Sequence, residues 1–292
     1  MTEAILAARH VGKSFASKHV LDDISARVGA GSVVGVLGKN GAGKTTLLEI
    51  ALGFSPASSG SVALWGHESA SLPSAVKGRI GYVPQQDELV PLLTGTQQIA
   101  LNAALHKRWD HELIARLVRE WEVPLDRRIA ALSGGERQKI SVLLALGHRP
   151  DLLVLDEPLA SLDPIARRQF LGQLLEITAD QGRAVIFSSH IVSDLERVAN
   201  EVWILREGRM AFEGELDALK ESVVRLHLSA RDKFPERLGI AHTLHEEVDG
   251  NTASVSVSGW SADAAAQLIS RLGVAIEVEP LDLEDIFLEM HR

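Results

Sequence analysis

The stretch GKNGAGKTT at residues 38–46 is the part of the sequence whose residue types and spacing most clearly predict chemistry. It fits the pattern G-x-x-x-x-G-K-[ST], an apolar run precedes it, and a helical pattern follows it, which disfavours a glycine turn that binds nothing. In that setting the loop N–H groups cradle phosphates, Lys44 reaches the outer phosphates and Thr45 coordinates Mg²⁺. The residues predicted to bind phosphate here are Gly38, Asn40, Gly41, Ala42, Gly43, Lys44, Thr45 and Thr46.

A second stretch, LLVLDEP at residues 152–158, places two adjacent carboxylates after an apolar run. Such a run predicts a buried strand with Asp156 at its C-terminal end, where parallel sheets bind ligands. Asp156 is expected to hold Mg²⁺, directly or through water, and Glu157 to orient an attacking water and accept its proton. The alternative, two ordinary loop acids, loses weight once the phosphate loop is accepted.

Gln85, in GYVPQQ, and His190, in VIFSSH, each follow a further apolar run. Because the ends of parallel strands meet at one edge of a sheet, both side chains are predicted to reach the same site. Glutamine could hold Mg²⁺ or the attacking water, and histidine could donate to the terminal phosphate. Taken alone, each would be an ordinary loop amide or surface histidine.

Residues 132–140, LSGGERQKI, predict a helix that begins after a serine cap. The two glycines allow close approach of a ligand, and the positive end of the helix attracts an anion. A simple capped helix is the alternative. The sequence therefore contains a second candidate phosphate site, far from the first along the chain.

Apolar runs punctuated by glycine alternate with helical patterns, which predicts an α/β fold with a largely parallel sheet. A small antiparallel β subdomain is expected in the first 30 residues, and a helical subdomain at about residues 92–150. The runs that predict buried strands of the central sheet are 32–38, 79–84, 151–158 and 183–189.

Near residue 220 the pattern changes to alternating apolar and polar residues. Residues 222–230 and 252–259 predict strands, DGN at 249–251 predicts a hairpin turn, and residues 261–273 predict a capped amphipathic helix. We therefore predict a first domain at residues 1–220 and a small C-terminal α+β domain at residues 221–292. That domain could reinforce a dimer, regulate it, or only stabilise the chain.

The composition narrows the classes of function. With 292 residues, 46% hydrophobic and 24% charged, the chain can bury a full core. The net charge of −9 argues against a nucleic-acid partner, and the absence of cysteine excludes disulfides and thiolate chemistry. Glu3 stands where a signal peptide carries basic residues, and no apolar run approaches the roughly 18 residues that a membrane helix needs. We expect a cytoplasmic protein without direct membrane insertion.

The sequence resembles the nucleotide-binding subunit of ATP-binding-cassette (ABC) transporters, because it carries six motifs of that family in the family's order. The motifs are GKNGAGKTT, GYVPQ, LSGGE, LLVLDEP, SLD (161–163) and SSH (188–190). The resemblance covers about residues 3–220 and implies a P-loop NTPase (ABC ATPase) core. The sequence departs from the family pattern at Lys39, Glu136 and Leu159, where proline, glutamine and threonine or serine are frequent. None of these changes removes a group needed for phosphate or metal binding.

The resemblance implies ATP and Mg²⁺ as cofactors and a dimer as the working form. In that family LSGGE reaches across the dimer to the nucleotide on the other subunit's P-loop. Asp163 would help to couple the two sites, and Phe15 would stack on adenine unless it is an ordinary core residue. A cassette that clamps ATP without turnover conflicts with the presence of Glu157. The residues implied to act in trans are Ser133, Gly134, Gly135, Glu136 and Asp163.

The implied function is that of an ATPase subunit that energises a separate transmembrane permease, as a homodimer at the inner face of the cell membrane. Residues 51–67 and 282–290 resemble the drug- and antibiotic-exporter branch, which implies export. The segment at 86–99 resembles the region that contacts the permease, with a solvated loop as the alternative. The other class considered is a soluble ABC ATPase of translation, DNA repair or cluster assembly. The chain has a single cassette, and only a short segment separates GKNGAGKTT from LSGGE. Both observations argue against this class of soluble ATPase.

Overall fold

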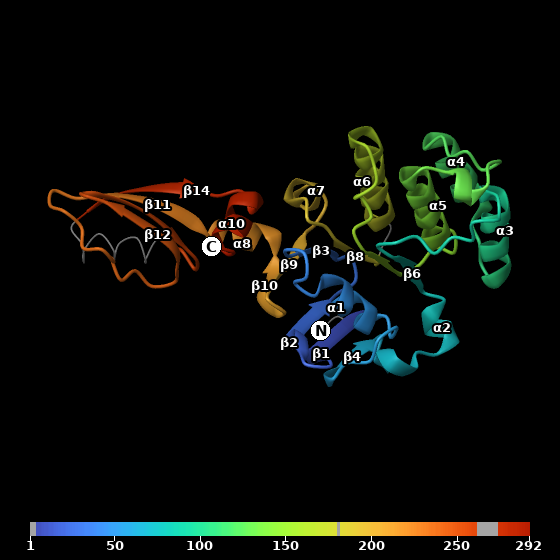
Figure 1. Cartoon of the computed structure of the whole chain (residues 1–292), viewed down its shortest axis with the longest axis horizontal. Helices are drawn as coiled ribbons and strands as arrows, with labels where there is room; N and C mark the ends of the chain where they lie inside the picture. Colours follow the sequence, from blue (N-terminus) through green and yellow to red (C-terminus); the bar gives the residue numbers. More distant parts are fainter. Residues whose placement is uncertain (1–3, 180–181, 262–273) are drawn as a thin grey trace. The chain divides into compact units, whose positions relative to one another are not determined.

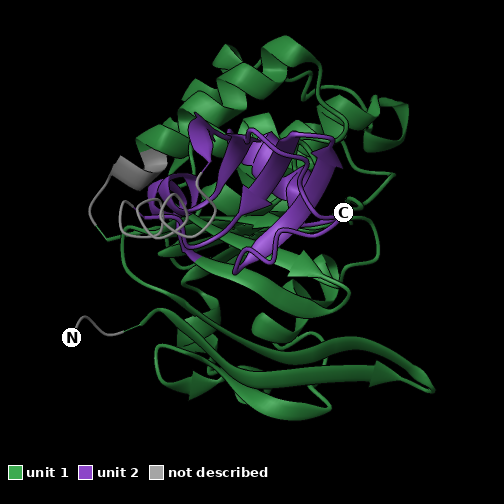
Figure 2. Ribbon diagram, turned by 90° about the vertical axis from the view of Figure 1, so that its left-hand side faces the viewer, with its two compact units in different colours: residues 1–213 green, residues 214–292 purple. Residues whose placement is uncertain are grey.

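A computed structural model describes residues 4–179, 182–261 and 274–292. The chain divides into two compact units, unit 1 at residues 1–213 and unit 2 at residues 214–292 (Figure 2). The division falls inside a strand, whereas the sequence pattern placed it after residue 220. Each unit has its own β-structure and its own hydrophobic core.

Unit 1 begins with a four-stranded antiparallel sheet in the order β2-β1-β4-β5. Apolar residues of β2, such as Leu21, Ile24 and Val28, are buried between exposed polar ones, which is the alternation expected of a strand with one covered face. The first 30 residues were predicted to form such a sheet, and residues 59–68 complete it. The strands are β1 (Leu6–Phe15), β2 (Lys18–Val28), β4 (Ser59–Leu64) and β5 (His67–Glu68).

The central sheet of unit 1 has six strands in the order β10-β9-β3-β8-β7-β6. β3 is parallel to β8 and β9, and β7 is parallel to β8 and β6, which confirms the predicted parallel core. All residues of β3, β7 and β8 are buried, as expected for strands covered on both faces. β9 and β10 were not predicted from the sequence. The strands are β3 (Val33–Leu37), β6 (Ile80–Val83), β7 (Leu152–Leu155), β8 (Ala184–Ser188), β9 (Glu201–Arg206) and β10 (Arg209–Glu215).

Helices cover both faces of the central sheet. Helix α1 (Lys44–Ala51) buries Leu47, Leu48 and Ile50 in a core to which both sheets contribute. On the opposite face lie α6 (Pro164–Ala179) and α7 (Val192–Glu196), as Figure 1 shows. This layering puts β3, and the loop that follows it, in the middle of unit 1.

The helical part of unit 1 contains α3 (Gly95–Leu105), α4 (His111–Glu120), η2 (Ile129–Ala131) and α5 (Gly134–Leu146). The three α-helices begin after Thr94, Asp110 and Ser133, whose side chains accept hydrogen bonds from backbone N–H groups of the first turn. These caps explain why the helices begin where they do. Two short helices precede them, η1 (Ser69–Ser71) and α2 (Ser74–Lys77).

Unit 2 contains a four-stranded antiparallel sheet in the order β12-β13-β11-β14. Asp249 pairs with Thr252, so the predicted hairpin turn is present. The helix predicted at 261–273 falls almost wholly outside the described residues. The elements are α8 (Leu216–Ser222), β11 (Val224–Ser229), β12 (Thr243–Asp249), β13 (Thr252–Val257), β14 (Ala275–Pro280) and α10 (Leu283–Glu289).

The core of unit 2 consists mainly of one face of this sheet, with Leu226, Val255 and Val257 almost fully buried. Neither unit has, among its described residues, a helix that is both long and apolar enough to cross a membrane.

Candidate active site

Four loops of unit 1 start where parallel strands end. They follow β3, β6, β7 and β8, which are neighbours or near neighbours in the central sheet. Because these strands run parallel, their C-terminal ends lie at one edge, and ligands of such sheets bind there. The P-loop, Gln85, the Asp156–Glu157 pair and His190 all lie on these loops.

Two glycines of the P-loop have a backbone conformation that other residues rarely adopt. Gly41 and Gly43 have φ values of 81° and 102°, in the left-handed region that glycine adopts without strain. A Cβ atom at Gly43 would lie 2.6 Å from Cδ2 of Leu21. Conformation and space therefore both require glycine at position 43, directly before α1.

Lys44 is buried and held by two oxygen atoms. Its Nζ donates to the backbone oxygen of Gly38 at 2.8 Å and lies 3.4 Å from Oε1 of Glu157. Both side chains are more than nine-tenths buried. An anion that binds next to a buried ion pair of this kind would disturb it, because each partner depends on the other for charge compensation.

The two adjacent acids are oriented by a side chain on the neighbouring strand. Ser188, at the end of β8, donates to Oδ1 of Asp156 at 2.6 Å and accepts from the N–H of Glu157 at 2.8 Å. Ser188 is fully buried. No role was predicted for Ser188, which belongs to the motif SSH, although a polar residue at the end of an apolar strand is a signal that could have identified it.

Glu157 stands between two cationic or ionisable groups. His190 Nδ1 lies 2.7 Å from Oε2 of Glu157, while Lys44 faces Oε1. Glu157 also has a φ of 49°, which is uncommon for a residue with a side chain and often marks a functional site. The structure thus brings the predicted base, the P-loop lysine and the predicted histidine into direct contact.

A hollow of about 370 Å³ lies over the P-loop. Lys18 and Val20, which the sequence analysis did not select, form part of its wall from strand β2. Gly38, Ala42, Asp156 and His190 are close by in the chain but do not line it. The predicted residues that line it are Asn40, Gly41, Gly43, Lys44, Thr45, Thr46, Gln85 and Glu157.

The residues at this hollow fit a magnesium ion. Oδ2 of Asp156 is buried and has no hydrogen-bond partner within the described chain. Asp156 lies beside the hollow, directly before Glu157, whereas Thr45 and Gln85 line the hollow itself. Mg²⁺ prefers oxygen ligands of these types, in particular a carboxylate oxygen that is not otherwise engaged.

Phe15 is half exposed at the end of β1, outside the wall of the hollow. The ammonium of Lys13 lies 4.7 Å from its ring centroid. The ring is therefore not a core residue, and one of its faces is already engaged by a cation.

The LSGGE turn lies apart from the P-loop hollow. Ser133 Oγ accepts from the N–H of Glu136 at 3.2 Å, and Oε2 of Glu136 accepts from the N–H of Ser133 at 2.7 Å, so the two residues form a capping box at the start of α5. Ser133 and Gly134 are exposed. None of the residues 133–136 lines the hollow.

Asp163 caps helix α6. Its Oδ1 accepts from the N–H groups of Ile165 and Ala166 at 2.9 and 3.0 Å, and these bonds lower the pKa of the carboxyl, with the Ala166 bond as the largest cause. The side chain is exposed at the surface of its own chain. Within its own chain Asp163 is a helix cap. The predicted coupling of two ATP sites would therefore require a second chain.

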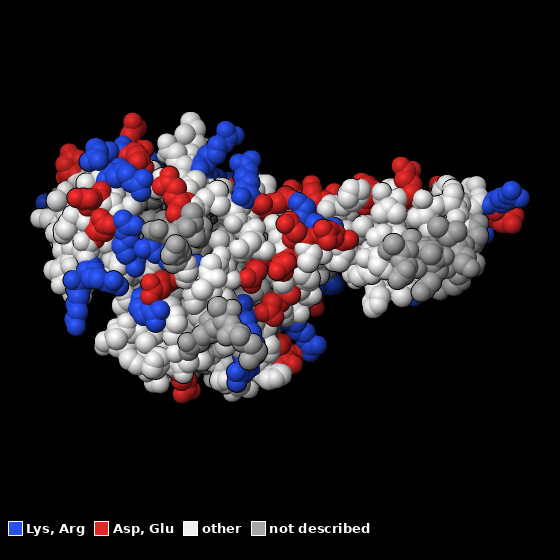
Figure 3. Space-filling view, turned by 180° about the vertical axis from the view of Figure 1, so that it is seen from behind, with Lys and Arg blue, Asp and Glu red and all other residues white. Residues whose placement is uncertain are grey.

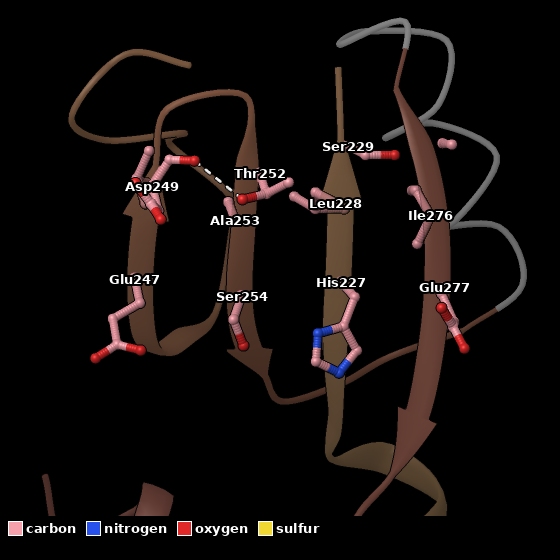
Figure 4. A pocket seen from close by; sticks show the side chains of 12 residues that line it. His227, Leu228, Ser229, Glu247, Asp249, Thr252, Ala253, Ser254, Ile276 and Glu277 are labelled. Atoms are coloured by element: carbon pink, nitrogen blue, oxygen red, sulfur yellow. Dashed lines mark hydrogen bonds between the residues drawn. The ribbon is translucent and has the colours of Figure 1, made fainter. Parts of the chain in front are cut away.

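Unit 2 has a hollow of its own, of about 700 Å³, on its sheet (Figure 4). Across the four strands Glu247, Ser254, His227 and Glu277 form one row of paired residues. Glu247, His227 and Glu277 are exposed. This hollow has no glycine loop and no buried charge among its lining residues, so it lacks the features of a phosphate site.

The surface is mixed in charge. On the face in view in Figure 3, basic and acidic side chains are interspersed over unit 1. That face does not have the broad basic area that nucleic-acid binding requires.

Comparisons with known proteins agree with this geometry. A family described as "ABC transporter" matches residues 21–160. The "Nod factor export ATP-binding protein I" of Burkholderia lata is 32% identical over 300 residues, which cover 99% of this chain and 98% of that protein. The "Uncharacterized ABC transporter ATP-binding protein YdbJ" of Bacillus subtilis is 31% identical over 224 residues, which cover 76% of this chain and 73% of that protein. A solved "Structure of ATP binding subunit of ABC transporter" matches with a TM-score of 0.66 and 28% identity over 74% of this chain and 92% of that chain.

Proposed function

This chain belongs to the ABC transporter family, and from that premise we propose that two copies of it enclose ATP between them and so drive a separate membrane permease. As an ATP-binding subunit of this family, the chain binds ATP and hydrolyses it.

Binding of ATP begins with an exchange of partners at Lys44. The triphosphate enters the P-loop hollow and replaces Glu157 as the counter-charge of Lys44, because it carries more negative charge than one carboxylate and meets the loop N–H groups. Support for this step comes from the 3.4 Å contact between Lys44 and Glu157, which a bound phosphate would disrupt. The exchange leaves the Glu157 carboxylate available beside the terminal phosphate.

Hydrolysis then uses Glu157 as the general base. Water attacks the terminal phosphorus, its proton passes to the Glu157 carboxylate, and the bond to the leaving ADP oxygen breaks. His190, whose Nδ1 lies 2.7 Å from Oε2 of Glu157, holds the carboxylate, and in the protonated form of its ring the second N–H can donate to the terminal phosphate. Mg²⁺, held by Thr45, Asp156 and Gln85, would neutralise charge on the phosphate oxygens.

The observation that carries the proposal is the separation of the two phosphate-type sites. The Ser133 turn is exposed and lines no part of the P-loop hollow of its own chain. A second copy, related by two-fold symmetry, can place its Ser133 turn over the ATP held at the first copy's Lys44. Gly134, Gly135 and Asp163 join that contact, and Phe15 stacks on the adenine.

The permease docks on an exposed apolar surface that lies after the P-loop helix and after Gln85. Phe54, Leu92 and Leu105 are 65%, 77% and 75% exposed, and Val90 and Leu101 are also exposed. Isolated exposed apolar residues are common, but a contiguous patch of them is typical of an interaction site, and we propose that these five, all within residues 54–105, contribute to one. The segment at 86–99 that the sequence analysis selected contains two of these residues.

Export is the direction we infer, because the relative from Burkholderia lata is named for export. The chain would then act at the inner face of the cell membrane, attached through the permease. A role in translation, DNA repair or cluster assembly has no such support, since both relatives are described as transport proteins or transporter subunits.

Ser133→Arg tests the sandwich. The substitution puts a bulky cation in the exposed turn, so it should abolish ATP-dependent dimers, which are measured by light scattering in a Glu157→Gln background. Binding of ATP to the single chain, measured by calorimetry, should remain within about twofold, since Ser133 lies outside the P-loop hollow. Dimers that still form with Ser133→Arg would contradict the proposal.

A further inference from the structure

The turn proposed to hold the partner's ATP carries a negative charge of its own. Glu136 is the third residue of α5 and belongs to the same capping box as Ser133. The Ser133 N–H, as the largest cause, and the Arg127 and Lys139 charges hold the pKa of Glu136 below its usual range, so the carboxyl is ionised at neutral pH. An anion so close to a phosphate-binding turn would repel the phosphate unless it is compensated.

Arg127 provides that compensation. Its Nη1 lies 3.2 Å from Oε1 of Glu136, while the other carboxylate oxygen accepts from the N–H of Ser133 at 2.7 Å. Its Nη2 donates to the backbone oxygen of Ala131, just before the turn. One guanidinium therefore contacts both the acid and the backbone that leads into Ser133.

The other nearby cations have different partners. Arg137 donates from Nε to Oδ2 of Asp87 at 2.9 Å and from Nη1 to the oxygen of Leu132 at 2.7 Å. Lys139 donates to the oxygen of Trp121 at 2.9 Å. Of these three side chains, Arg127 alone forms an ion pair with Glu136.

The backbone around Arg127 is fixed to the segment after Gln85. The oxygen of Arg127 accepts from the N–H of Gly95 at 3.2 Å, and the N–H of Ile129 donates to the oxygen of Leu93 at 2.8 Å. These bonds hold Arg127 in place beside the capping box without any contribution from a nucleotide.

We propose that Arg127 is a positioning residue for the trans ATP site: it neutralises Glu136 and orients it along the turn, so that the Ser133 turn can accept the terminal phosphate of the ATP bound by the second chain. This role rests on the sandwich proposed above.

The test is a double-mutant cycle at Arg127 and Glu136 in the Glu157→Gln background. Light scattering measures the ATP concentration that gives half-maximal dimer formation. Arg127→Gln should raise that concentration about tenfold, because it leaves the Glu136 charge uncompensated. Glu136→Gln removes the charge that Arg127 compensates, while glutamine can still complete the capping box, so this variant is the reference for the double variant. The double variant should return to within about twofold of Glu136→Gln.

Arg128→Gln is the matched control. Arg128 is the neighbouring residue, is exposed, and has no ion pair in the described part of the chain, so its removal changes the net charge equally without exposing Glu136. Raised salt should reduce the defect of Arg127→Gln and leave Arg128→Gln unchanged. Thermal unfolding of each variant checks that unit 1 remains folded.

Each outcome has a definite meaning. If Arg127→Gln dimerises like the parent, or if the double variant stays as impaired as Arg127→Gln, the charge role of Arg127 is wrong and its contact with Ala131 is merely structural. If the parent itself forms no ATP-dependent dimer, or if Ser133→Arg has no effect, the sandwich is wrong and the role of Arg127 falls with it.

Discussion

The P-loop hollow of unit 1 and the sheet hollow of unit 2 differ in a way that volume does not reveal. The hollow in unit 2 is the larger, at about 700 Å³ against about 370 Å³, and both contain carboxylate and hydroxyl groups. In unit 1, however, Lys44 and Glu157 are buried, and nearby Asp156 is fully buried. In unit 2, Glu247, Asp249 and Glu277 are exposed to solvent.

Burial of charge is the informative difference. An ionised group in a protein interior is destabilising unless a partner compensates it, so a fold retains such groups where they are used. Unit 2 also buries a carboxylate, that of Glu289, and its Oε2 likewise has no hydrogen-bond partner among the described residues. However, its Oε1 pairs with Arg225 and Arg292 at 2.9 and 3.1 Å, and it lies on a helix and not at a strand end, away from the residues that line the hollow. A buried acid with a free oxygen at a strand end, as in Asp156, identifies the chemical site better than the size of a cavity.

The strongest test of this difference removes one charge from each hollow. Glu157→Gln should lower the ATP turnover at least about 100-fold, because the base for the attacking water is lost. Glu247→Gln, the matched change in unit 2, should leave turnover within about twofold. Phosphate release measures both, and a similar loss in the two variants would remove the distinction between the hollows.

A second test separates the units by stability. Leu226 is fully buried in the core of unit 2, so Leu226→Ala should lower the free energy of unfolding of that unit by about 2–5 kcal/mol. Below the unfolding temperature, ATP turnover should be unchanged. Calorimetric unfolding together with phosphate release checks both statements, and turnover that falls along with unit 2 would show that the units do not act separately.

A third test compares two glycines with left-handed backbones. Gly43→Ala should weaken ATP binding about tenfold or more, since strain of about 1–3 kcal/mol adds to a clash with Leu21 in the P-loop. At Gly250, with a φ of 61°, a Cβ atom would meet no described atom within 4 Å. Gly250→Ala should destabilise unit 2 by about 1 kcal/mol and leave ATP binding, measured by calorimetry, unaffected.

The smallest expected effect is a pH dependence confined to unit 1. His148 is buried, its ring stacks on His106 at 4.2 Å, and its Nε2 lies 3.0 Å from the oxygen of Ile80. Burial, as the largest cause, lowers the pKa of His148, so the unfolded chain binds the proton more readily. The stability of unit 1 should therefore fall as the pH drops below about 6.5, by at most about 1.4 kcal/mol per pH unit.

His148→Gln should weaken that dependence, because glutamine can still donate to Ile80 but does not titrate. The unfolding of unit 2 should change little over the same pH range. The hydrogen bond from His227 is the largest cause that lowers the pKa of Glu279, and a lowered carboxyl pKa changes stability only at pH values below the usual pKa of a glutamate. Unfolding temperatures at about pH 7.5 and about pH 5.5 measure both. An equal acid sensitivity in His148→Gln would assign the effect to other groups.

The parts that the sequence predicted share a physical basis. Apolar runs such as that at 152–155 predict strands buried on both faces, and a polar residue directly after such a run must lie at the edge of the sheet. The parallel core and the position of the P-loop, Gln85, Glu157 and His190 at one edge followed from this reasoning. The alternation in the first 30 residues and at 252–259 likewise identified the antiparallel strands.

What the sequence did not predict depends on side chains that are far apart in the chain. Nothing in the pattern indicates that Lys44 pairs with Glu157, that Lys18 lines the hollow, or that Arg127 meets Glu136. These contacts are set by rotamers and by packing between loops. The strands β9 and β10 were missed although VWIL at 202–205 is an apolar run, because no chemical motif drew attention to it.

The contact of Ser188 with both acids has a consequence for how this centre can change. One hydroxyl on β8 fixes the candidate metal ligand and the candidate base at the same time. A replacement that removes this hydroxyl would take a donor from the Asp156 carboxylate and an acceptor from the backbone N–H of Glu157, so one mutation on the neighbouring strand affects both positions. Adaptation of the hydrolysis rate in this chain is therefore more accessible through the half-exposed His190, whose ring pairs with Glu157 rather than with both acids.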